Sequence, residues 1–189
     1  MQGLWRGVDH DVARRTTRHL SEVVLNEWPD HGPTLLRYAR ALIELALYDK
    51  AASVLDHAWQ VVSEDKRHLF LAQRGHLLEC MGDLEEFEAM YLEAHAFDPD
   101  DATYLIYAGS VAFRRGDLDR AKELARKAMT CPEGCVDEAY FNLGGYLLTQ
   151  GNYQEARDCY RKALEIDPDY AMAKTRLADV EGVIAYRGE

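Results

Sequence analysis

Apolar residues recur along most of the chain at i, i+3, i+4 and i+7, which is the spacing of amphipathic helices. Short polar turns separate these stretches at regular intervals of 34 and 35 residues: Gly82-Asp83-Leu84, Gly116-Asp117-Leu118 and Gly151-Asn152-Tyr153. Asp98-Pro99 and Asp167-Pro168 close two of the units, as proline does at the end of a helix. A fixed period of this length predicts pairs of antiparallel helices that repeat along the chain.

The clearest unit runs from Asp137 to Tyr170. Its first helix reads Tyr140-x-x-Leu143-Gly144-x-x-Leu147, and its second reads Ala156-x-x-x-Tyr160-x-x-Ala163-Leu164 before Pro168. This series resembles the tetratricopeptide repeat (TPR), a motif of two antiparallel helices. We expect Gly144 to lie where the first helix meets Ala156 of the second, so that the two helices approach closely and large neighbours fill the remaining space.

Earlier segments carry the same residue types in register, so the resemblance predicts an all-α fold. The expected architecture is a right-handed α-solenoid of antiparallel helix pairs, with about four TPR units. The predicted boundaries are an N-terminal helix or half-repeat over 1–31, repeats over 32–67, 68–101, 102–136 and 137–170, and a capping helix over 171–189.

One position departs from the pattern in the second repeat. Phe87 stands where Ala51, Ala121 and Ala156 stand in the other repeats. A phenyl ring there must displace a neighbour or fill the space that Gly75 leaves open. We expect a local distortion in this repeat.

The resemblance also implies a function. TPR arrays bind peptides or protein segments in a concave groove lined by the first helix of each repeat, at positions that share one helical face. The residues at such positions here include Leu36, Arg40, Ile43, Leu69, His76, Ile106, Phe113, Arg114, Phe141 and Leu148. We expect the rings of Phe113 and Phe141 to lie near each other in this groove. The alternative interpretation is that the apolar members are half-buried between repeats.

Some TPR proteins hold the C-terminal carboxylate of a chaperone with a clamp of Lys, Asn, Asn, Lys and Arg. In the best of three registers only Asn142 and Arg176 match. Without the lysines the charge-assisted hydrogen bonds to a carboxylate are missing, which argues against this clamp.

Charge narrows the choice of partner. The chain of 189 residues has a formal net charge of −11, and residues 64–101 hold 3 basic and 11 acidic side chains. Such a surface repels phosphate backbones, so we expect no nucleic-acid ligand. Between Asp83 and Asp98 six carboxylates occur without a Lys or Arg. This stretch is either a solvated helix face or a landing site for a basic partner.

The sequence offers little else that carries chemistry. His76 and Cys80 have the i, i+4 spacing of a ligand pair, but zinc needs more ligands than these two, so we expect no metal and no cofactor. Motifs of hydrolases, nucleotide-binding proteins and zinc proteases are absent, so we expect no enzyme.

The chain has no run of 18 apolar residues and no hydrophobic leader, which predicts no membrane insertion, reduced cysteines and a cytoplasmic location. Whether Cys131 and Cys135 form a disulfide under oxidation is left open by the sequence.

The predicted function is a non-catalytic protein–protein interaction module that binds a peptide or protein segment in its groove. The alternative is a structural scaffold, a homo-oligomer that associates through the ends of the array.

Overall fold

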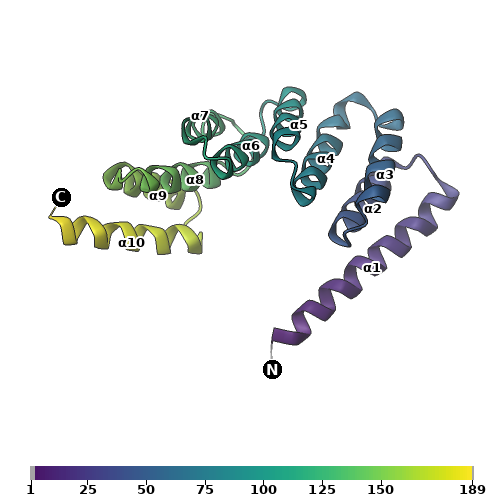
Figure 1. The fold of residues 1–189 in the computed structure, drawn as a ribbon, viewed down its shortest axis with the longest axis horizontal. Coiled ribbons are helices and arrows are strands. Elements are labelled where there is room, and N and C mark those ends of the chain that lie inside the picture. The colour runs from purple at the N-terminus through teal and green to yellow at the C-terminus, as the bar shows by residue number, and fades with distance from the viewer. Residues whose placement is uncertain (1–2, 189) are drawn as a thin grey trace. The chain divides into compact units, whose positions relative to one another are not determined.

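The computed structural model describes the backbone of residues 3–188 and the side chains of residues 10–188. This part of the chain contains ten α-helices, one short 3-10 turn and one isolated bridge between Asp101 and Glu133 (Figure 1). The predicted all-α solenoid of antiparallel helix pairs is confirmed. The helices form two compact units that divide after Phe97. None of the described helices is both long enough and apolar enough to cross a membrane.

The first unit begins with a long helix and continues with two antiparallel helix pairs. Its elements are α1 (Gly3–Glu27), α2 (Gly32–Glu44), α3 (Tyr48–Val61), η1 (Glu64–Lys66), α4 (Arg67–Met81) and α5 (Leu84–Phe97). Helix α1 packs along α2, where the Tyr38 hydroxyl donates a 3.0 Å hydrogen bond to Glu22. Helix α4 packs against both α2 and α3, so the two pairs share a core of Leu and Ala side chains closed by Phe70.

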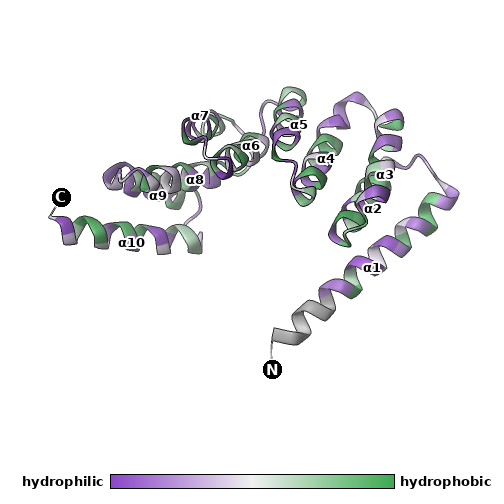
Figure 2. Cartoon of the chain, viewed as in Figure 1, coloured by the Kyte–Doolittle hydropathy of each residue, from purple (hydrophilic) through white to green (hydrophobic). Residues whose placement is uncertain are grey.

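The second unit consists of two further helix pairs and a final single helix. Its elements are α6 (Thr103–Arg114), α7 (Leu118–Ala128), α8 (Val136–Thr149), α9 (Tyr153–Ile166) and α10 (Ala171–Arg187). Helix α8 packs against both α6 and α7, and α10 packs against α9. Apolar and polar residues alternate along the helices of both units (Figure 2), which is the pattern that lets each helix bury one face.

The recurrent polar turns join the two helices of a pair. Gly82, Gly116 and Gly151 have φ of +85°, +83° and +76°, a left-handed conformation that glycine adopts without a steric penalty. In the second of these turns, Gly116 is followed by Asp117. The Asp117 carboxylate accepts a 3.1 Å hydrogen bond from the backbone N–H of Arg120 and thereby caps α7. The first pair has Ala46 at the corresponding place, with φ of +56°.

In two of the helix pairs, α4 with α5 and α8 with α9, close contact depends on a glycine that faces a tyrosine ring. A Cβ atom on Gly144 would lie 2.8 Å from Cε1 of Tyr160, which is one of the large neighbours that pack beside this glycine. In α4 a Cβ atom on Gly75 would lie 2.5 Å from Cε2 of Tyr91. Both approaches are closer than a methyl group allows, and therefore only glycine fits without displacing the tyrosine.

The large side chain of Phe87 is accommodated beside Gly75. The ring is 1% exposed, and one of its edge carbons lies 3.4 Å from the place of a Cβ on Gly75. It meets Tyr91 edge to face, with ring centroids 4.9 Å apart. Because Gly75 has no side chain, it leaves room for the Phe87 ring.

The final helix docks through one face only. Ala173, Val180 and Ile184 are buried, whereas Tyr186 is 94% exposed. Ala178 is exposed as well. Helix α10 therefore keeps a solvent-facing side that contains aromatic and aliphatic residues.

Candidate protein-binding groove

In the first unit two of the predicted groove residues line one open cleft. Leu36 lies on α2 and Leu69 on α4, and both border a cleft of about 510 Å³ together with Pro33. Leu69 is 37% exposed and Leu36 is half-buried. Successive first helices therefore bring these two aliphatic side chains to the same surface.

Part of this cleft comes from residues outside the predicted set. Val61, Val62 and Lys66 line it from the end of α3 and from η1. The TPR groove positions lie on first helices, so they do not include this connecting segment. The only sequence signal was the extra length of the first repeat, and the structure places η1 within that segment.

Farther along the same helices the groove positions are polar or charged. The Arg40 guanidinium lies 3.1 Å from the Glu44 carboxylate, and Arg14 of α1 approaches the same carboxylate at 3.3 Å. On α4, Nδ1 of His76 lies 3.5 Å from a carboxylate oxygen of Glu79. These exposed or half-exposed pairs add polarity but little stability.

Two predicted lining residues are not available to a partner. Ile43 is 2% exposed and belongs to the apolar core of the first unit. Ile106 is 4% exposed and lies beside Gly109 and Tyr146 in the second unit. Their assignment to a binding surface was wrong, because neighbouring helices cover both side chains.

In the second unit the predicted aromatic residues pack on tyrosines. Phe113 is 39% exposed and stacks on Tyr146 with centroids 4.8 Å apart. Phe141 is half-buried and contacts Tyr160 and Tyr170, at centroid distances of 5.6 Å and 5.0 Å. Each phenylalanine thus has its own tyrosine partners, and the expected pairing of the two rings is not among the aromatic contacts of the described residues.

The remaining predicted residues of this unit differ in exposure. Arg114 is exposed at the end of α6, and Leu148 is half-buried near the end of α8. The sequence of α8 contains no Lys or Arg, and its first turn carries Asp137 and Glu138. Burial, followed by the charge of Asp137, raises the pKa of Glu138. A positive group from a partner would relieve this unfavourable placement of charge.

The thiols are poorly suited to act as nucleophiles. Burial and the nearby Asp101 carboxylate raise the pKa of Cys131, and burial with Glu138 and Asp137 does the same for Cys135. Burial raises the pKa of the Cys159 thiol to about 11. All four cysteines are free, and over residues 10–188 no three His, Cys, Asp or Glu side chains cluster in a way that could hold a metal ion.

Helix pairs of this length, with glycine turns and glycine–tyrosine contacts, define an α-helical repeat protein. Residues 137–170 match the family model described as tetratricopeptide repeat. Over this segment the chain is similar to the tetratricopeptide repeat family.

Relatives and solved structures agree with this assignment. Human tetratricopeptide repeat protein 7A is 35% identical over 100 residues, which cover 53% of this chain and 12% of that protein. The thermophilic TPR protein TTC0263 of Thermus thermophilus superposes with a TM-score of 0.68 at 21% identity, covering 86% of this chain and 88% of that one. The first TPR of Spaghetti (RPAP3), bound to an HSP90 peptide, gives a TM-score of 0.59 at 20% identity, covering 65% of this chain and 99% of that one. The chain spans between 12% and 16% of the length of the first curated relatives it matches.

Proposed function

We propose that the chain is a non-catalytic interaction module that binds a peptide or protein segment along the first helices of its repeats. The observation that carries this proposal is the cleft of the first unit, where Leu36 and Leu69 from successive repeats border one open apolar surface. The peptide-bound RPAP3 domain, which shares this fold, supports the same mode of use.

The chemistry of the cleft favours a segment with an aliphatic or aromatic anchor. Pro33, Leu36 and Leu69 present apolar atoms, while Lys66 and Asp30 stand at its border. Burial of apolar surface contributes roughly 25 cal/mol per Å², so one anchored side chain is worth on the order of 1–2 kcal/mol. The adjoining polar contacts, Arg40 with Glu44 and His76 with Glu79, would set the orientation of the segment rather than its affinity.

Two single substitutions test the cleft. A display library of 12-residue peptides is selected on the full chain, and the affinity of the selected peptide is measured by fluorescence polarisation. Leu36→Asp and Leu69→Asp are each expected to weaken binding at least about tenfold, because a carboxylate replaces the apolar contact and must be desolvated. The matched control is Ile166→Asp, since Ile166 is an exposed aliphatic residue outside this cleft.

Thermal unfolding of each variant shows whether it is folded. The proposal is overturned if both cleft variants bind the selected peptide with the same affinity as the control variant. It is also overturned if binding is lost only because the variants are unfolded at the assay temperature.

The terminal helices favour a second candidate, a scaffold that self-associates. On α10, Met172 is 58% exposed and Tyr186 94%, and on α1, Leu20 is 58% exposed. Terminal repeats normally present a polar outer face. Light scattering at several concentrations separates the two candidates: a mass that rises with concentration, and returns to that of a monomer in Tyr186→Lys, would support the scaffold.

A further inference from the structure

A second cleft opens in the first unit, between α3, α4 and α5. It has a volume of about 430 Å³, and its floor is formed by the buried residues Leu55, Phe70 and Leu71. Trp59 of α3 and Met90 of α5 form its half-buried walls. Leu36 and Leu69 do not line it, so it is distinct from the groove cleft, although the Phe70 ring contributes to both.

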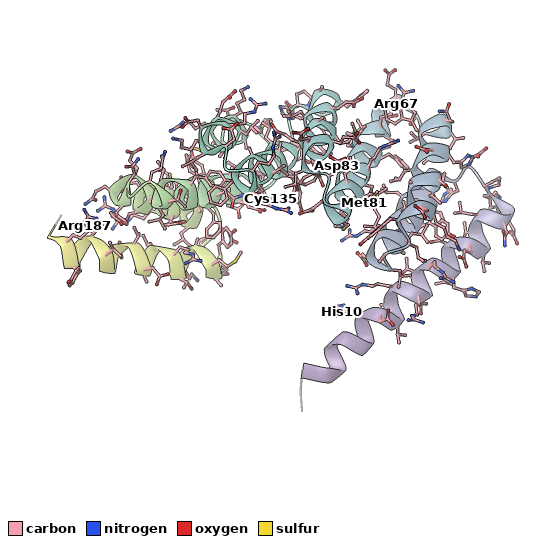
Figure 3. All side chains as sticks on the ribbon, viewed as in Figure 1. His10, Arg67, Met81, Asp83, Cys135 and Arg187 are labelled. Atoms are coloured by element: carbon pink, nitrogen blue, oxygen red, sulfur yellow. The ribbon has the colours of Figure 1, made fainter. Side chains whose placement is uncertain are left out.

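The wall residues suit an apolar side chain. The Arg67 guanidinium lies over the Trp59 ring, 4.8 Å from its centroid, and this cation–π contact holds the indole in place. Figure 3 labels Arg67, which is the first residue of α4, and Asp83, which comes just before α5. Met90 is unbranched and polarisable, so it adapts its shape to whatever packs against it.

Two carboxylates border the cleft on the same face of α5 as Met90. Glu86 precedes Met90 by four residues and Glu93 follows it by three, so each stands about one helical turn away. Neither carboxylate has an ion-pair partner among the residues whose side chains the structure describes. By contrast Arg74, the basic residue of the cleft, is engaged by Asp56 at 2.8 Å.

Charge around the cleft selects one kind of occupant. From Asp83 to Asp98 the chain contains six carboxylates and no Lys or Arg, and residues 64–101 hold 3 basic and 11 acidic side chains. This field repels acidic segments and nucleic acids and attracts basic ones over about 10 Å at moderate ionic strength. An apolar floor between two carboxylates therefore complements an apolar side chain between two cations.

We propose that this cleft is a second docking surface, separate from the groove, for a basic protein segment. The segment inserts one apolar side chain between Trp59 and Met90. A Lys or Arg on each side of that anchor reaches Glu86 and Glu93. The chain thereby holds two different segments in two clefts of the same pair of repeats.

A binding assay on the full chain tests this surface. A display library with a central Leu flanked on each side by Lys, and without Trp, is selected in parallel with a library in which Glu replaces Lys. Trp5→Phe and Trp28→Phe leave Trp59 as the single tryptophan of the chain. The selected basic peptide is expected to shift the emission of Trp59, since it buries the indole further.

Charge reversal supplies the decisive comparison. The double substitution Glu86→Lys and Glu93→Lys is expected to weaken binding of the basic peptide at least about tenfold. In the unchanged chain, a higher salt concentration should also weaken binding of this peptide. The matched control, Glu27→Lys with Glu155→Lys, changes the net charge equally at exposed carboxylates outside the cleft and should leave affinity within about twofold. All four positions are exposed, so both double variants are expected to fold.

Several outcomes would overturn the proposal. One is that the acidic library is enriched as strongly as the basic library, or that the basic library is not enriched at all. Others are an unchanged Trp59 emission on binding, equal weakening by the control pair, and binding that depends on Leu36 and Leu69 instead. The last result would place the peptide in the groove and would leave the proposed function intact.

Discussion

The two units use corresponding positions of their first helices in different ways. In the first unit, Leu36 borders an open cleft with Leu69. In the second unit, Phe141 has the same place in its helix as Leu36 but lies half-buried against Tyr160 and Tyr170. One position in the repeat thus provides a surface in one unit and internal packing in the other.

The segment that follows the second helix of each pair accounts for much of this difference. After α9 the chain supplies Tyr170, whose ring lies 5.0 Å from that of Phe141. After α3 it supplies Ser63 and Lys66, which border the cleft of Leu36 and do not fill it. Exposure at a groove position therefore depends on the connecting segment as well as on the helix that carries it.

The largest expected effect would separate the two units directly. Phe141→Asp is expected to lower the free energy of unfolding by about 2–4 kcal/mol, because it removes a half-buried ring and places a carboxylate between two tyrosines. Leu69→Asp should lower it by less than about 1 kcal/mol, since Leu69 is already 37% exposed. Urea denaturation followed by circular dichroism measures both.

Equal losses of stability in the two variants would contradict the comparison. They would mean that Leu69 is as important for packing as Phe141, and that the open cleft is not a free surface. Phe113→Asp serves as an internal reference, because its ring is 39% exposed but still stacks on Tyr146. Its effect should lie between the other two.

The sequence predicts the repeated helix pairs well because their determinants are local. Glycine turns, proline ends and apolar spacing act over a few residues, so the all-α solenoid followed from them. The candidate groove is different. Ile43 and Ile106 have the right periodicity for a lining, but packing by neighbouring helices buries them. Likewise, the contribution of Lys66 depends on a connecting segment whose path the repeat pattern does not specify.

A second variant tests packing inside a pair of the second unit. Gly144→Leu is expected to lower the free energy of unfolding by about 1–3 kcal/mol, because even its Cβ would lie 2.8 Å from the Tyr160 ring. The measurement is again the urea midpoint. A midpoint that does not change would mean that α8 and α9 can separate without penalty, and the register of this pair would be wrong.

The neighbouring glycine provides the control for that test. A Cβ on Gly145 would lie 3.9 Å from the Tyr160 hydroxyl, which is ordinary contact. Gly145→Ala should therefore be neutral or stabilising by up to about 1 kcal/mol, as expected for glycine replaced within a helix. Opposite signs at adjacent positions would assign the effect to the tyrosine contact.

The smallest expected effect concerns the turn that distinguishes the first pair from the others. Ala46 has φ of +56°, whereas glycines occupy the turns of the later pairs. A left-handed conformation is unfavourable for alanine by roughly 1–2 kcal/mol, and the greater freedom of glycine in the unfolded chain offsets part of this. Ala46→Gly is therefore expected to raise the free energy of unfolding by about 0.5–1 kcal/mol. Ala89→Gly, at an exposed site within α5, should lower it by a similar amount. If both substitutions destabilise the chain, the strain at Ala46 is relieved by its surroundings, and the first turn does not differ energetically from the others.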